Sequence, residues 1–117
     1  MKRGTVYVGD DVLYRRSYGA RLAEMQEFAP DAFAAYAAWD RAAFQEGALP
    51  SKVKELIAVA VAHVTGCPYC IEAHVGRLKT LGGTREELME AVQIAGLLKA
   101  GSALAHGVNA LNAFDRA

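Results

Sequence analysis

The sequence predicts an all-α fold of about six helices in a homo-oligomeric protein, and two observations support the helical part of that prediction. After residue 10, apolar residues recur at the i, i+3, i+4 spacing of amphipathic helices. Strand-like composition is confined to one short run, residues 5–8. The chain has 117 residues, of which 53% are hydrophobic, which is enough for one core, so we expect a single domain over residues 1–117.

Proline and glycine residues divide the first half of the chain into three predicted helices. The first spans residues 11–28, and Pro30 opens a second that stops at Gly47. Pro50 opens a third helix, which is apolar on opposite sides and is therefore expected to be buried nearly all round. The second helix carries aromatic residues that we expect in the core or in a substrate wall: Phe33, Tyr36, Trp39 and Phe44.

The second half of the chain is expected to form three more helices. The fourth starts at Cys67, with a proline in its first turn, and ends at Gly82–Gly83. Thr84 and Glu87 have the spacing of a capping box, which predicts the start of a fifth helix. Gly101–Ser102 is expected to separate or kink a last helix.

Charge and hydropathy exclude several classes of function. Thirteen basic residues balance thirteen acidic ones, so nothing indicates a nucleic-acid or anionic-lipid partner. The first residues lack the apolar stretch of a secretory signal, which predicts a cytoplasmic protein. The longest apolar run, residues 56–62, is far shorter than the roughly 20 residues that span a bilayer, so no membrane role is expected. Several helix faces stay apolar after one core is filled, which predicts a homo-oligomer.

The chemistry is expected at the two cysteines of the chain, in the motif Cys67-Pro-Tyr-Cys70. A close pair in a cytosolic chain is typical of a redox dithiol or a metal site. His74 follows Cys70 by four residues, so a helix places both thiols and the imidazole on one face. A helix N-terminus favours the thiolate, and cysteines in such settings reach pKa values of about 3.5–7.5. One thiol can then attack a substrate while the other closes a disulfide.

A carboxylate that can orient His74 stands one helix earlier. Glu55 lies in the apolar third helix, on a side that runs towards the cysteine turn. Glu55 and His74 are the expected proton relay, and the candidate catalytic residues are Glu55, Cys67, Cys70 and His74. Tyr69 either packs or lines the thiol pocket. His63 is expected to be a hydrogen-bonded core histidine, or else to orient the catalytic side chains by hydrogen bonds without contacting the substrate.

The stretch from Glu55 to His74 resembles the core motif of the carboxymuconolactone decarboxylase and alkylhydroperoxidase-D family, a glutamate followed by CxxCxxxH. The residue types match, as does the spacing of twelve positions from Glu55 to Cys67, and the resemblance covers about residues 31–100. It implies an all-helical subunit, assembly as trimers of longer chains or hexamers of short ones, and reduction of alkyl hydroperoxides by the dithiol. By this resemblance Cys70 attacks the peroxide, Cys67 resolves the sulfenic acid, and Glu55 and His74 relay protons.

The chain departs from alkylhydroperoxidase D between the cysteines, where that enzyme commonly has a histidine and this chain has Tyr69. The start of a helix also favours the first cysteine, Cys67, as the more activated thiol, which opposes the implied order. The disulfide needs an external dithiol to reopen it, such as a lipoyl group or a thioredoxin-like protein. No bound cofactor is expected, because the sequence has no glycine motif that cradles phosphate.

Two other functions stay open. Carboxymuconolactone decarboxylase itself decarboxylates a lactone acid and does not rely on a CxxC dithiol, which this chain has. The other is a non-catalytic zinc or binding module, in which Cys67, Cys70 and His74 supply three ligands, with Glu55 or His63 as the fourth. One CxxC without a second pair of ligands is weak evidence for zinc, so no metal is expected.

Overall fold

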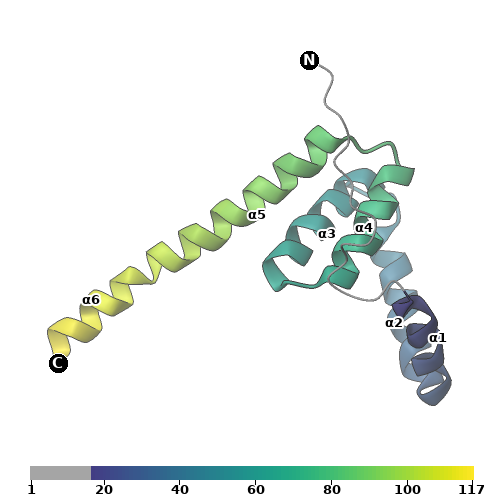
Figure 1. The fold of residues 1–117 in the computed structure, drawn as a ribbon, viewed down its shortest axis with the longest axis horizontal. Helices are drawn as coiled ribbons and strands as arrows, with labels where there is room; N and C mark the ends of the chain where they lie inside the picture. Colours follow the sequence, from purple (N-terminus) through teal and green to yellow (C-terminus); the bar gives the residue numbers. More distant parts are fainter. Residues whose placement is uncertain (1–16) are drawn as a thin grey trace. The chain divides into compact units, whose positions relative to one another are not determined.

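The structure, a computed structural model, describes residues 17–117 and has α-helices but no strand in that part of the chain. The helices are α1 (Tyr18–Phe28), α2 (Pro30–Phe44), α3 (Ser51–Thr65), α4 (Pro68–Thr80), α5 (Arg85–Ala105) and α6 (Gly107–Arg116) (Figure 1). This confirms the predicted all-α fold. The strand-like run at residues 5–8 and the expected start of the first helix at residue 11 lie outside the described residues.

The chain divides into two compact units, with the division between Ala43 and Phe44. The first unit contains α1 and nearly all of α2, and the second contains α3 to α6. A single domain over residues 1–117 stays a prediction. The α2 helix begins at Pro30, as predicted, but ends at Phe44, before the expected stop at Gly47.

The aromatic residues of α2 differ from the prediction. Tyr36 and Trp39 are 64% and 72% exposed, so a place in the core is wrong for both, and their place in a substrate wall stays a prediction. Their two rings contact each other edge to face, with ring centroids 6.4 Å apart. Phe33 is half-buried, and Phe44, which belongs to the second unit, is half-buried and stacks on His74 of α4.

The core of the second unit is built on α3, which packs against both α4 and α5. The buried apolar residues are few and come from all three helices: Val59, Ala62, Leu78 and Ala95. Within residues 17–117 the main contacts of α3 are with these two helices, and a stripe at i, i+4 and i+7 on its surface is exposed: Ile57, Val61 and Val64. The prediction that this helix is buried nearly all round is therefore wrong for the chain by itself.

A tight turn joins α3 to α4 and positions the cysteines. Gly66 has a φ of 71°, the left-handed conformation that glycine adopts without strain, and its N–H bonds the carbonyl of Ala62 at 2.9 Å. The N–H of Cys67 bonds the same carbonyl at 3.1 Å. Cys67 then caps α4, and Pro68 occupies the first helical position, where no N–H is needed. The predicted capping box at the start of α5 is also present, between Thr84 and Glu87.

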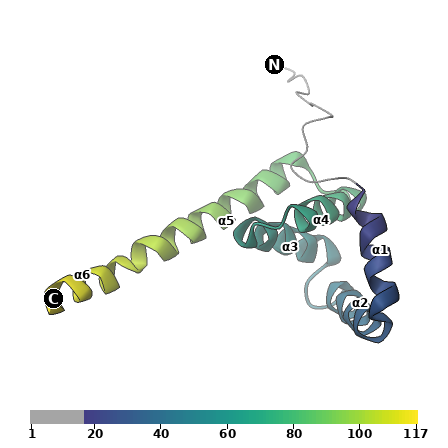
Figure 2. The same ribbon diagram turned by 60° about the horizontal axis from the view of Figure 1, so that its bottom comes forward.

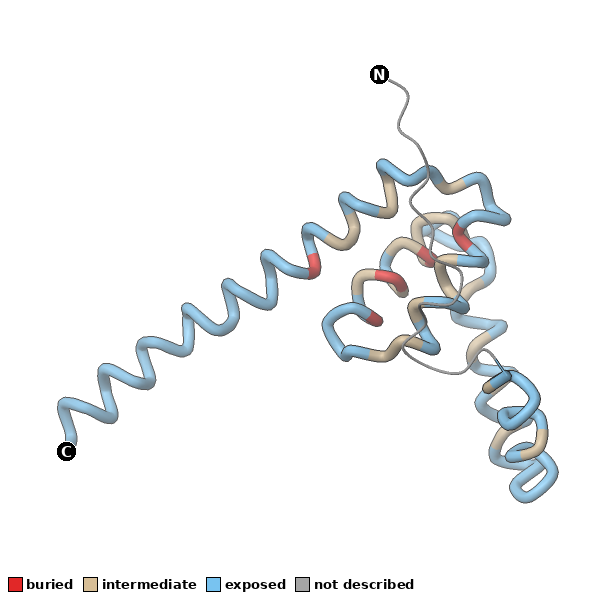
Figure 3. The backbone as a smooth tube through the Cα atoms, viewed as in Figure 1, coloured by how far each residue is buried: buried red, intermediate tan, exposed pale blue. Residues whose placement is uncertain are grey.

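The α5 and α6 helices extend beyond α3 and α4 (Figures 1 and 2). The distal half of α5 and all of α6 are exposed (Figure 3). We call Ala100–Arg116 the arm. The predicted separation of a last helix at Gly101–Ser102 is wrong, because α5 runs through both residues and ends at Ala105, and a kink there stays a prediction.

By length and composition, the helical segment Arg85–Arg116 could cross a membrane, with a mean hydropathy of 1.2 in its most apolar stretch. Only 6% of that stretch is buried. A helix that packs in a core or against another subunit meets the same criterion, so the segment is weak evidence for a membrane span. The expectation of no membrane role stays a prediction.

Candidate dithiol site

The two thiols lie together at the start of α4. The Sγ atoms of Cys67 and Cys70 are 2.7 Å apart, and both residues are free cysteines. As the capping residue of α4, Cys67 also accepts a hydrogen bond on its Sγ from the backbone N–H of Cys70, at 3.3 Å. Cys70 is exposed and Cys67 is half-buried. The helix start thus gives Cys67 donors that a free cysteine lacks.

These donors separate the two thiols in acidity. The pKa of Cys67 is lowered, first by the hydrogen bond from the Cys70 thiol, then by the backbone N–H groups of Cys70 and Tyr69. The pKa of Cys70 is raised, first because its thiol donates to Cys67, then by burial and by the charge of Cys67. The pair therefore titrates as a unit, and its first thiolate resides mainly on Cys67.

A buried carboxylate holds the histidine that follows on the same helix. Glu55 of α3 is 3% exposed, and its Oε2 lies 2.7 Å from Nδ1 of His74 on α4. A carboxylate only accepts hydrogen bonds, so Nδ1 carries a proton in this contact. The contact leaves Nε2 of His74 to accept or donate a proton on its other side. His74 follows Cys70 by one helical turn, which puts both on the same face of α4.

Two more residues complete the surroundings of this pair, and neither was among the predicted site residues. The ring of Phe44 stacks on the imidazole of His74, with centroids 5.2 Å apart and planes inclined by 22°. The guanidinium of Arg77 lies 5.8 Å from the centre of the same ring. Nη1 of Arg77 is also 3.9 Å from Oε1 of Glu55. The helical spacing from His74 to Arg77 was a signal for the position of Arg77, whereas Phe44 was expected in the core or in a substrate wall.

The remaining sequence candidates have other environments. His63 is exposed, and its Nδ1 bonds the carbonyl of Val59 in its own helix at 2.8 Å, so it is hydrogen-bonded as predicted but not in the core. Tyr69 has an exposed side chain and contributes its backbone N–H to Cys67. Within residues 17–117, no three or more His, Cys, Asp or Glu side chains are grouped so that they could hold a metal ion.

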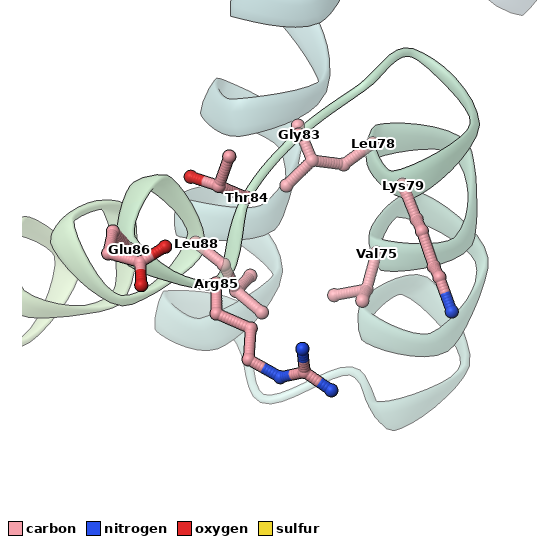
Figure 4. Close-up of a pocket in the computed structure, with 8 residues that line it drawn as sticks. All are labelled: Val75, Leu78, Lys79, Gly83, Thr84, Arg85, Glu86 and Leu88. Atoms are coloured by element: carbon pink, nitrogen blue, oxygen red, sulfur yellow. The ribbon is translucent and has the colours of Figure 1, made fainter. Parts of the chain in front are cut away.

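The second unit also has a cavity of about 460 Å³ beside the junction of α4 and α5 (Figure 4). It is lined by Val75, Leu78, Lys79, Gly83, Thr84, Arg85, Glu86 and Leu88. The residues of the dithiol site do not line it. We therefore assign the chemistry to the start of α4 and not to this cavity.

An all-helical unit with a dithiol at a helix start and a buried glutamate–histidine pair defines the class of alkylhydroperoxidase-D-like proteins. The model of the Carboxymuconolactone decarboxylase family matches residues 30–113, and the chain belongs to this family. The match confirms the resemblance found in the sequence.

Relatives in sequence and in structure agree with this assignment. The chain is 48% identical over 81 residues to "Uncharacterized protein 4 in cox locus" of Paracoccus denitrificans, covering 69% of this chain and 73% of that protein. A carboxymuconolactone decarboxylase family protein from Legionella pneumophila has a crystal structure with a TM-score of 0.69 and 36% identity, covering 86% of this chain and 90% of that one. Alkyl hydroperoxide reductase AhpD of Mycobacteroides abscessus is 43% identical over 44 residues, which are 38% of this chain and 25% of that enzyme.

Proposed function

We propose that the protein reduces hydroperoxides or disulfides through a dithiol–disulfide cycle of Cys67 and Cys70, with Glu55 and His74 as the proton relay. The observation that carries the proposal is the 2.7 Å approach of the two Sγ atoms at a helix start. On the same helix, His74 is held by the buried Glu55. The sequence similarity to alkyl hydroperoxide reductase AhpD supports peroxide as the substrate class.

The acidity of the two thiols supports an order of steps. The Cys67 thiolate attacks the terminal oxygen of a hydroperoxide, the O–O bond breaks, and the alkoxide leaves as an alcohol after it takes up a proton. Cys67 is then a sulfenic acid. His74 takes the proton of the Cys70 thiol, and the Cys70 thiolate attacks the Cys67 sulfur. The hydroxide that leaves takes the proton from His74 and departs as water, which closes the disulfide.

This order reverses the one that the family resemblance implies, in which Cys70 attacks first. The reason is physical: the thiol with the lower pKa is the first to lose its proton as the pH rises, and the hydrogen-bond donors that lower the pKa converge on Cys67. The relay then serves Cys70, whose pKa is raised and which needs a base before it can resolve the sulfenic acid. A lipoyl dithiol or a thioredoxin-like protein reopens the disulfide by exchange, and a reducing cytoplasm suits the free thiols.

Turnover tests this function. Purified protein should consume tert-butyl hydroperoxide in the presence of dihydrolipoate, and the double variant Cys67→Ser, Cys70→Ser should not. Consumption that needs neither cysteine would contradict the proposal. A variant that still decarboxylates a muconolactone acid would favour the other branch of the family.

We also propose a second copy of this chain as the partner that covers the long C-terminal helices. Eight large side chains along α5 and α6 are more than half exposed and apolar: Met89, Ile94, Leu97, Leu98, Leu104, Val108, Leu111 and Phe114. At on the order of 100 Å² each, they approach the roughly 800 Å² per partner of a stable interface. Contiguous apolar surface of this extent is unusual on a soluble monomer, which supports a hexameric or trimeric homo-oligomer.

Charges placed on the arm test this interface. The double variant Leu104→Glu, Leu111→Glu is expected to lower the oligomer mass measured by light scattering after size exclusion, with affinity weakened by at least about 30-fold. Asn109→Glu on α6 adds one negative charge at a polar residue of the arm and should leave the mass unchanged. A wild-type protein that is monomeric at tens of micromolar, with the arm covered by its own α1–α2 unit, would refute this partner.

A further inference from the structure

The two carboxylate oxygens of Glu55 face two different basic side chains. Oε2 meets Nδ1 of His74 at 2.7 Å, and Oε1 faces Nη1 of Arg77 at 3.9 Å. The carboxylate is nearly inaccessible to water, whereas the Arg77 side chain is 48% exposed. The two contacts differ in one chemical respect: an imidazole gains and loses its proton near neutral pH, and a guanidinium keeps its charge.

That difference matters for a proton relay. When His74 is neutral and ready to act as a base, Glu55 would be a buried anion without a cationic partner if His74 were its sole neighbour. An unpaired buried charge is costly, so such a pair would hold its proton and His74 would be slow to return to the basic form. A permanent cation next to Oε1 compensates the carboxylate in both states of His74. Arg77 supplies that cation.

Phe44 holds the arrangement together. Its ring contacts both the imidazole of His74 and the guanidinium of Arg77, which are three residues apart on α4. The backbone carbonyl of Phe44 accepts a hydrogen bond from Oγ of Ser51 at 3.0 Å, which ties the ring to the start of α3. Glu55 follows on the same helix one turn later. The cation and the imidazole are therefore fixed relative to the carboxylate that they share.

We propose that Arg77 is a positioning residue, which keeps Glu55 ionised and oriented so that His74 can alternate between its neutral and protonated forms. This inference rests on the proposed relay. It adds a residue that the residue pattern and the family resemblance did not single out. It also predicts that the effect of Arg77 on the thiols runs through Glu55.

Four other basic groups on α3 and α5 have partners of their own. Lys52 of α3 pairs with Glu87 of α5 at 2.9 Å, and Lys99 of α5 donates to the carbonyl of Val64 at 3.2 Å. Lys54 and His63 of α3 bond the backbone carbonyls of Gln45 and Val59. The titratable groups that remain next to His74 on its own face of α4 are Cys70 and Arg77.

Alkylation of Cys70 by iodoacetamide tests the inference without requiring any redox activity. The parent protein for this test is the Cys67→Ser variant, in which Cys70 is the remaining thiol. The rate at which Cys70 is alkylated is measured between pH 6 and pH 10 by mass spectrometry of the product. Adding Arg77→Met is expected to move the midpoint of this profile upward by about half a pH unit, because the cation that stabilises the deprotonated cluster is gone. Arg77→Lys should restore most of the shift. Lys79→Met removes a positive charge from the same helix outside the cluster and should leave the midpoint in place.

A double-mutant cycle with Glu55→Gln locates the effect. If Arg77 acts through Glu55, then Arg77→Met causes no further shift in the Glu55→Gln background. A full shift in that background would overturn the inference, as would an Arg77→Met profile that overlays the parent or that matches Lys79→Met. Because the alkylation profile reports only the ionisation of the Cys70 thiol, a failure of peroxide turnover would reject the proposed function and leave this result intact.

Discussion

Cys67→Ser is expected to slow alkylation of the protein by iodoacetamide at pH 7 by at least about tenfold. The pKa of Cys67 is held below its ordinary value by the Cys70 thiol and by backbone N–H groups, so its thiolate persists at a pH where Cys70 is still protonated. The pKa of Cys70 is raised, so the serine variant keeps the less reactive thiol. Mass spectrometry of the labelled peptide between pH 5 and 10 measures both rates.

Cys70→Ser is the matched control for this prediction. It removes the thiol donor that contributes most to the low pKa of Cys67 but keeps the backbone N–H of residue 70. The pKa of Cys67 should therefore rise in this variant. It should still stay below the pKa of a free cysteine, because the backbone donor remains. If wild-type protein is labelled at Cys70 before Cys67, the order of steps proposed above is wrong, and the order implied by the family resemblance holds.

Glu55→Gln is expected to slow closure of the Cys67–Cys70 disulfide by about 100-fold, which is the scale of general acid–base catalysis. The amide keeps the volume of the carboxylate, so packing changes little, but it carries no charge to stabilise a protonated His74. The step affected is the removal of the Cys70 proton. Reduced protein mixed with one equivalent of hydroperoxide and quenched at intervals gives the rate of disulfide formation.

Glu87→Gln provides the comparison, because the partners of Glu87 are Lys52 and the capping residue Thr84. It should alter the free energy of unfolding slightly and leave disulfide closure unchanged. A Glu55→Gln variant that closes its disulfide at the wild-type rate would show that the buried carboxylate is a structural group. Thermal unfolding of both variants separates a loss of stability from a loss of proton transfer.

Much of the local structure follows from short-range signals in the sequence. The starts at Pro30 and Ser51, the turn at Gly66 and the capping box of Thr84 were all predictable, because each depends on residues within one helical turn. The separation of a last helix expected at Gly101–Ser102 was wrong. A single glycine costs a helix about 1 kcal/mol, which a long alanine-rich and leucine-rich helix tolerates, and the chain instead interrupts the helix at His106.

The candidate site was predictable in part. The spacing between Glu55 and His74 indicated a relay, and the structure brings the two together at 2.7 Å. The roles of Phe44 and Arg77 were not predictable, since they depend on how the Phe44 ring packs against His74 and Arg77, which lie far from it in the sequence. The burial of α3 was overestimated for a similar reason. An apolar helix face indicates that something covers it, but the pattern does not say whether the cover is the same chain or a second copy.

The most direct test of the dithiol cycle is a titration of the fully reduced protein with hydroperoxide, followed by thiol counting and peptide mapping. We expect that one equivalent of hydroperoxide removes both thiols of a chain and forms an intramolecular Cys67–Cys70 disulfide. We also expect the protein thiols to react with hydroperoxide faster than free cysteine does. Thiols that stay intact, that react no faster than free cysteine, or that form disulfides only between chains would contradict it.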